Sequence, residues 1–209
     1  AHLVSDGIYI STVKADDGWR VLVDTEAIDQ AGAHQEAIIR HRVFDRENQL
    51  LAESENDIVL SKQVSVDQQT IYLERPRLWD HEDPYLYTIK TDLIAGGKAL
   101  DTESQTFGFR SLRFDSPEGF FINDKQLSLQ GACQHHDLGA LGAAMNKTAL
   151  RRQLELLMEM GVNAIRTAHN MPAVELMDLA DELGILIVSE AFDMWERNKT
   201  DYDYGRFFN

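Results

Sequence analysis

The stretch LSLQGACQHHD at residues 127–137 is the first of three apolar runs in this chain that end in polar side chains. NAIRTAHN at residues 163–170 is the second run, and ILIVSEAFD at residues 185–193 is the third. Each run is predicted to form a strand, and residues 185–188, which are apolar without alternation, have the pattern of a strand buried on both faces. Parallel strands joined by helices carry functional groups at their carboxyl ends, so the three polar endings predict one wall of an active site.

Two segments with helical periodicity separate these runs. The apolar face of the first segment consists of Leu150, Leu154, Leu157 and Met158. Asn146 or Thr148 is expected at its start and Gly161 at its end. The second segment is expected to begin at Pro172 and to end at Gly184. Its inward-facing residues are expected to be Ala173, Leu176, Met177, Ala180 and Leu183. The pattern predicts the first three β/α units of a (β/α)8 TIM barrel, too few to close the barrel.

The first half of the chain alternates between apolar and polar residues with the period of two that is typical of half-buried strands. Six runs have this character: residues 7–13, 19–24, 37–44, 69–73, 85–93 and 102–109. A hairpin turn is expected farther along, at Asn123-Asp124. About seven short strands over about 110 residues are typical of an immunoglobulin-like β-sandwich. We therefore expect a sandwich domain at residues 1–111 and the incomplete start of a TIM barrel at residues 112–209.

The composition excludes some classes of partner. The 209 residues include 20 Lys and Arg against 35 Asp and Glu, a net charge of −15. Nucleic acids and anionic membranes are bound through clustered Lys and Arg, so neither is an expected partner. No apolar run approaches the roughly 20 residues that span a bilayer. The single Cys133 leaves no intrachain disulfide, and no signal-peptide pattern precedes the first strand, but neither observation fixes the compartment.

Several polar residues at the strand ends are candidates for a binding site. An imidazole such as that of His135 can bind a sugar hydroxyl, although a structural hydrogen bond stays equally open. Adjacent histidines point in different directions, so His135 and His136 are not expected to hold one metal ion. Arg166 lies on a strand between apolar neighbours and needs a carboxylate partner if it is buried; Glu190 is the expected partner. A purely structural ion pair stays open for these two residues.

The remaining candidates are His169, Asn170, Asp193 and Trp195. His169 has no evident structural role, whereas Asn170 is best explained as a cap of the second helix. Asp193 adds a carboxylate close to the end of the third strand. Trp195 would either stack on a sugar ring or pack under a loop. A weaker alternative, a metal-dependent hydrolase, would use His135, His136, Glu190 and Asp193.

Longer motifs contain all of these candidates except Trp195. They are GACQHHDLGALG at residues 131–142, GVNAIRTAHNMP at residues 161–172 and DELGILIVSEAFD at residues 181–193. Together with FGFR at residues 107–110 and FINDK at residues 121–125, they resemble glycoside hydrolase family 2. The resemblance covers essentially the whole chain. The barrel half is most similar to bacterial β-galactosidases.

The resemblance implies a retaining hydrolase that acts on terminal β-linked galactosyl residues of a saccharide. The residues that it implies for substrate binding are His135, Arg166, His169 and Glu190. Asp193 and Trp195 are added to the expected substrate-binding residues because they follow the third strand. The family's acid/base and nucleophile glutamates are expected beyond Asn209, so no catalytic residue is expected in this chain. A sugar-binding domain is likewise expected before Ala1. We therefore interpret the chain as an inactive segment of a longer bacterial protein, cytoplasmic or periplasmic, for which a homo-oligomer stays open.

The chain departs from the family pattern at two places. Gln134 stands where arginine or asparagine is common, and the Glu-x-His magnesium pattern of some β-galactosidases is not visible after Glu190. We therefore expect no metal or cofactor on these residues, with Mg²⁺ or Na⁺ left open for the longer protein. Two alternatives to a β-galactosidase stay open: a β-glucuronidase or β-mannosidase, and a non-catalytic module that binds carbohydrate or docks onto another domain.

Overall fold

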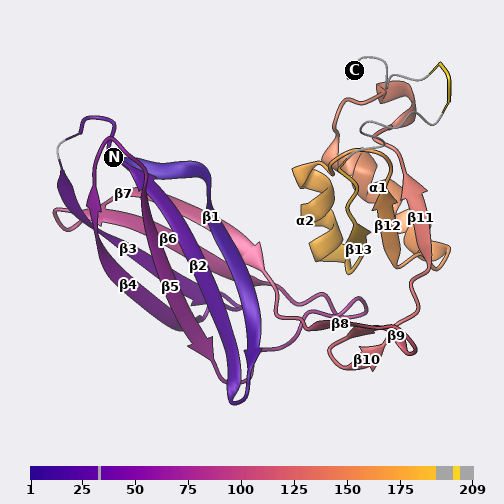
Figure 1. Ribbon diagram of the computed structural model, residues 1–209, viewed down its shortest axis with the longest axis horizontal. Coiled ribbons are helices and arrows are strands. Elements are labelled where there is room, and N and C mark those ends of the chain that lie inside the picture. The colour runs from indigo at the N-terminus through magenta and orange to yellow at the C-terminus, as the bar shows by residue number, and fades with distance from the viewer. Residues whose placement is uncertain (33, 192–199, 203–209) are drawn as a thin grey trace. The chain divides into compact units, whose positions relative to one another are not determined.

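Two compact units make up the part of the chain that the computed structural model describes, which is residues 1–32, 34–191 and 200–202 (Figure 1). The first unit comprises Ala1–Asp80, Pro84–Phe114 and Phe121–Lys125. The second comprises His81–Asp83, Asp115–Phe120 and Gln126–Asn209. Among the described residues, no helix has both the length and the apolar composition needed to cross a membrane.

Two antiparallel sheets form the first unit (Figure 1). One sheet has the order β1-β2-β5, with β1 at His2–Ala15, β2 at Gly18–Ile28 and β5 at Ser65–Leu73. The other has the order β4-β3-β6-β7, with bounds Leu50–Leu60, Gln35–Phe44, Tyr87–Ala95 and Lys98–Phe107. The two sheets confirm the predicted sandwich architecture.

Residues with a period of two fill the space between these sheets. In β2, Trp19, Val21 and Val23 are buried, and the residues between them face outward. Phe109 lies at the centre of an aromatic group: its ring centroid is 5.7 Å from that of Trp19 and 5.1 Å from that of Tyr87. Both contacts are edge-to-face, the arrangement that the charge distribution of aromatic rings favours.

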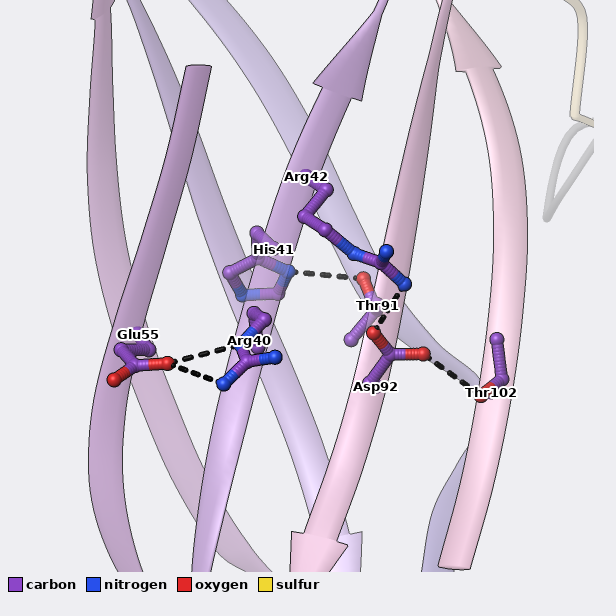
Figure 2. Close-up of polar contacts among 7 residues, drawn as sticks. All are labelled: Arg40, His41, Arg42, Glu55, Thr91, Asp92 and Thr102. Carbon is purple, nitrogen blue, oxygen red and sulfur yellow. Dashed lines mark hydrogen bonds and ion pairs between the residues drawn. The ribbon is translucent and has the colours of Figure 1, made fainter. Parts of the chain in front are cut away.

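A histidine side chain lies inside this core. His41 on β3 is fully buried, with Nδ1 2.9 Å from Oγ1 of Thr91 and Nε2 3.4 Å from Oγ1 of Thr25. Figure 2 shows the contact with Thr91. Burial lowers the pKa of His41 from 6.5 to about 4, although Asp67 and Asp92 act in the opposite direction. The imidazole is therefore neutral at neutral pH, and its two threonine partners satisfy it in that form.

Ion pairs cross the strands beside His41 (Figure 2). Nη2 of Arg40 lies 2.9 Å from Oε2 of Glu55, and Nη2 of Arg42 lies 2.6 Å from Oδ2 of Asp92. Asp92 also accepts a hydrogen bond of 2.8 Å from the Thr102 hydroxyl. The side chains of Arg40 and Glu55 are 37% and 55% exposed, so this pair belongs to the solvated face of the sheet, whereas the side chain of Asp92 is 9% exposed.

One strand of the sandwich, β4, was not among the six predicted runs. Its sequence LLAESENDIVL lacks clean alternation, and most of its residues are exposed; Leu60, at its end, is the buried one. Acidic residues such as Glu55 face the basic residues of β3 instead of the core. Strand β4 therefore forms through its backbone pairing with β3. The periodicity of its sequence does not predict it.

In its described residues, the second unit has three parallel strands and two α-helices (Figure 1). The strands are β11 at Gly131–Gln134, β12 at Ala164–Thr167 and β13 at Leu186–Val188, in the order β11-β12-β13. A short 3-10 helix at Gly139–Leu141 and α1 at Lys147–Glu159 connect the first two strands, and α2 at Val174–Leu183 connects the last two. This alternation confirms the predicted start of a barrel.

Helix α1 largely matches its sequence pattern. Asn146 is the N-cap, with its side chain accepting a hydrogen bond of 2.9 Å from the backbone N of Ala149. Leu150 and Leu154 are buried, and Leu157 and Met158 pack against the same core. Met160 is the C-cap, and Gly161 follows it with the left-handed φ of 88° that favours glycine.

Helix α2 differs from the prediction at its start and on one face. The backbone N atoms of Leu176 and Met177 donate to the carbonyl of Ala173, so the helix begins two residues after Pro172. Ala173, an extended residue without a side-chain cap, is the N-cap, and Asn170 does not have the predicted capping role. Met177 is exposed, and Leu179, which was not predicted to face inward, is buried in its place. Gly184 ends the helix as predicted.

A small antiparallel sheet of order β10-β9-β8 lies between the sandwich and barrel sequences. Its strands are β8 at Leu112–Asp115, β9 at Gly119–Ile122 and β10 at Lys125–Gln126. Asn123 and Asp124 both have positive φ, 49° and 66°, and connect β9 to β10. Two left-handed residues in succession make the tight hairpin turn that the sequence predicted.

Candidate active site

Strand register brings the polar strand ends of the second unit together. Arg166 on β12 pairs in register with Cys133 on β11 and with Val188 on β13. It therefore occupies the middle of the sheet, one residue before β12 ends. His169 and Glu190 follow the carboxyl ends of β12 and β13. A parallel sheet places such residues at one edge, as the sequence predicted.

The carboxylate of Glu190 is the centre of the site. Its Oε2 lies 2.7 Å from Nη2 of Arg166, which is the ion pair that the sequence predicted. Its Oε1 lies 3.4 Å from Nδ1 of His169. The backbone N of Glu190 donates a hydrogen bond of 3.0 Å to Oγ1 of Thr167. Three neighbours on or just after β12 thus hold one glutamate.

Arg166 has a second partner on its other side. Nη1 donates to the sulfur of Cys133, an exposed free cysteine, at 3.4 Å. The contact with Cys133, with a further contribution from Glu190, raises the pKa of the Arg166 guanidinium. The guanidinium therefore stays protonated and supplies a fixed positive charge. The Arg166 side chain is 43% exposed. It is therefore less buried than its apolar neighbours in the sequence had suggested.

The two adjacent histidines of the first polar cluster turn to different partners. The rings of His135 and His169 meet edge to face, with 5.4 Å between their centroids. Nε2 of His136 lies 3.1 Å from the carbonyl O of Ala143 in the following loop. His135 therefore belongs to the group around Glu190, and His136 orders the loop. This divergence weakens the metal-site interpretation, in which both histidines served together.

A pocket lies beside the site, with about 450 Å³ of empty space that is partly open to solvent. His135, His136 and Asp137 line it on the polar side, and Leu138 and Met145 contribute apolar surface. Gln134 lines the same pocket and donates a hydrogen bond of 2.5 Å to Oε1 of Gln153 on α1. The lining of the pocket therefore combines polar and apolar side chains.

The structure places four of the six predicted site residues. His135, Arg166, His169 and Glu190 come together; Asp193 and Trp195 lie outside the described residues. Sequence reasoning did not single out Cys133 or Thr167. The sequence signal for Thr167 was weak, because it consisted only of a polar residue among apolar ones. In the structure Thr167 is buried, and its hydroxyl accepts a hydrogen bond from the backbone N of Glu190.

The sequence of the chain matches known families over both units. Residues 1–110 match glycosyl hydrolases family 2, and residues 115–200 match the family 2 TIM barrel domain. The chain belongs to glycoside hydrolase family 2. A β-galactosidase named BoGH2A, from Bacteroides ovatus, is 38% identical to this family 2 chain, and the match covers 100% of this chain. A putative β-glucuronidase from Formosa agariphila is 38% identical over 70% of the chain.

Solved structures agree with the family 2 assignment. A glycosyl hydrolase family 2 member from Bacteroides cellulosilyticus superposes with a TM-score of 0.90 at 33% identity, over 99% of this chain and 27% of that one. A β-glucuronidase from Bacteroides uniformis gives a TM-score of 0.87 at 28% identity, over 96% of this chain and 25% of that one. The family 2 chain also spans 25% of the Bacteroides ovatus enzyme. It therefore corresponds to about a quarter of each of these three Bacteroides proteins, and it spans 14% of the Formosa agariphila protein.

Proposed function

We propose that this chain forms the sugar-binding side of the active site in a retaining glycosidase of the β-galactosidase type. The observation that carries the proposal is the Glu190 carboxylate, which contacts Arg166 at 2.7 Å and His169 at 3.4 Å at the carboxyl ends of parallel strands. Carboxyl ends of barrel strands carry the active site in this fold. The ring of His135 completes the group against His169.

The chemistry of the group suits a polyhydroxylated ligand. Imidazoles and a carboxylate offer both donors and acceptors to hydroxyl groups. The side chains remain accessible, with 35% of His169 and 21% of Glu190 exposed. Because Arg166 and His169 already fix the Glu190 carboxylate, a sugar hydroxyl would meet an oriented acceptor. We assign His135, His169 and Glu190 to contacts with the sugar, and Arg166 to holding Glu190 in place.

The acid/base and nucleophile glutamates, which would break the glycosidic bond, are included in the proposal only because of the family resemblance. In a retaining glycosidase, two carboxyl groups about 5–5.5 Å apart act as acid/base and as nucleophile, through a glycosyl-enzyme intermediate. On the basis of that resemblance, we propose that both glutamates follow Asn209 in the longer protein. In this proposal, the residues of this chain bind and orient the sugar, and those glutamates cleave it.

A matched pair of histidine variants tests the proposal in the full-length protein. We expect His169→Asn to lower kcat/KM on an aryl β-galactoside by roughly a hundredfold, because contacts to the sugar strengthen in the transition state. His136→Asn is the control, since that ring contacts the loop carbonyl of Ala143. Equal losses from both variants, or no hydrolysis by the unchanged protein, would overturn the proposal.

A β-glucuronidase is the second candidate. It is favoured by relatives of that name, among them the Formosa agariphila protein, which matches at the same 38% identity as the β-galactosidase from Bacteroides ovatus. The ratio of kcat/KM on aryl β-galactoside and aryl β-glucuronide decides between the two. We expect the galactoside to be preferred; a preference for the glucuronide would assign the second activity.

A further inference from the structure

Thr167 connects two strands at the point where their backbone ladder stops. The register of β12 with β13 runs from Ala164 opposite Leu186 to Arg166 opposite Val188, and β13 ends there. Glu190 lies two residues beyond this end, yet its backbone N donates a hydrogen bond of 3.0 Å to the Thr167 hydroxyl. A side-chain oxygen thus replaces the backbone acceptor that an extended ladder would have provided.

The Thr167 side chain is itself held in place. It is 5% exposed, and Thr167 pairs in register with Gln134 of β11. The next residue, Ala168, donates its backbone N to the Gln134 carbonyl at 3.0 Å. A buried β-branched side chain has few accessible rotamers, so the hydroxyl is a rigid anchor. The position of the Glu190 backbone therefore depends on the sheet through Thr167.

We infer that Thr167 is a positioning residue that sets where the Glu190 carboxylate stands between Arg166 and His169. The inference rests on the proposed function, in which that carboxylate accepts a sugar hydroxyl. The 2.7 Å contact with Arg166 orients the carboxylate group of Glu190. The Thr167 hydroxyl fixes the backbone from which that side chain extends. Displacing a binding group by a fraction of an ångström weakens interactions that strengthen in the transition state.

Two substitutions separate the hydroxyl from the shape of the side chain. In the full-length protein, Thr167→Val keeps the branched shape but removes the acceptor. We expect it to lower kcat/KM on an aryl β-galactoside by roughly tenfold, the equivalent of one buried hydrogen bond. Thr167→Ser retains the hydroxyl and should recover most of the activity. Thr91→Val is the matched control, because Thr91 is also buried and hydrogen-bonds to His41 in the sandwich.

A double-mutant cycle with Glu190→Gln distinguishes positioning from general destabilisation. If Thr167 acts through Glu190, Thr167→Val should cause little further loss once the carboxylate has been replaced. Losses that multiply in the double variant, or a Thr167→Ser variant as impaired as Thr167→Val, would overturn the inference. A Glu190→Gln variant with full activity would instead overturn the proposed function itself. The two failures are therefore distinguishable.

Discussion

Nη2 of Arg166 lies 2.7 Å from Oε2 of Glu190, across the carboxyl ends of β12 and β13. On its opposite side the same guanidinium contacts the Cys133 sulfur at 3.4 Å. A planar group with donors in a fixed fork spans the two strands that flank β12. Arg166 on β12 thereby connects its own strand to β11, through Cys133, and to the segment after β13, through Glu190.

Replacing this fork with an ammonium should disturb the site. We expect Arg166→Lys in the full-length protein to lower kcat/KM on an aryl β-galactoside at least about tenfold, because lysine is a point charge that cannot reproduce both contacts. Steady-state kinetics measure the effect. Arg40→Lys is the control: it changes an ion pair with Glu55 on the solvated face of the sandwich, where such pairs contribute little. An unchanged Arg166→Lys variant would contradict the role of the fork.

The 209-residue chain by itself should not hydrolyse glycosides. It carries the groups proposed to bind the sugar, and the proposed acid/base and nucleophile come after Asn209. We expect no release of the aryl group above background, under conditions in which the full-length protein is active. Turnover by the isolated chain that the Glu190→Gln substitution abolishes would show that this chain contains the catalytic groups.

Acid should destabilise the sandwich through His41. Its pKa is about 4 in the folded state and 6.5 ordinarily, so the unfolded chain binds the proton more tightly. The stability conferred by the neutral imidazole is complete above pH 6.5 and decreases as the pH falls toward about 4. The loss approaches roughly 3 kcal/mol over that window.

Urea unfolding of the chain at several pH values between 7.5 and 4.5 measures this effect. Many carboxylates also titrate in acid, so the informative quantity is the difference between the unchanged chain and a His41→Gln variant. Glutamine retains hydrogen-bonding capacity toward Thr25 and Thr91 but does not titrate. We expect a flatter pH dependence for the variant. Parallel curves for the two proteins would refute the role of His41.

Gly184, the C-cap of α2, should not tolerate a side chain. Its φ is 83°, and a Cβ atom built there would lie 2.2 Å from the backbone O of His81. We expect Gly184→Ala to cost about 1 kcal/mol for the left-handed φ and several more for the collision with backbone. Gly96→Ala is the control, because Gly96 also has positive φ, 58°, but has open space around its Cβ position. Comparable losses of stability in the two variants would show that the collision with His81 is relieved cheaply.

The division of the chain into sandwich and barrel parts was accessible from periodicity. A period of two over the first half and a period of 3.6 around Leu150 and Leu154 each reflect which face of a local element is buried. Periodicity did not predict the segments that are mostly exposed or irregular. Strand β4 has few buried residues, and the start of α2 depends on which carbonyl the first turn uses, that of Ala173.

The sequence by itself determined that polar residues follow three strands, because strand-forming runs and the turns after them are local properties of the chain. Tertiary structure decided the contacts that the sequence did not predict. Register across the strands gave Arg166 a second partner in Cys133, and it placed the Thr167 hydroxyl within hydrogen-bond distance of the Glu190 backbone N. These contacts join residues as far as 33 positions apart, and their geometry comes from the packing of strands and helices, which no local pattern encodes.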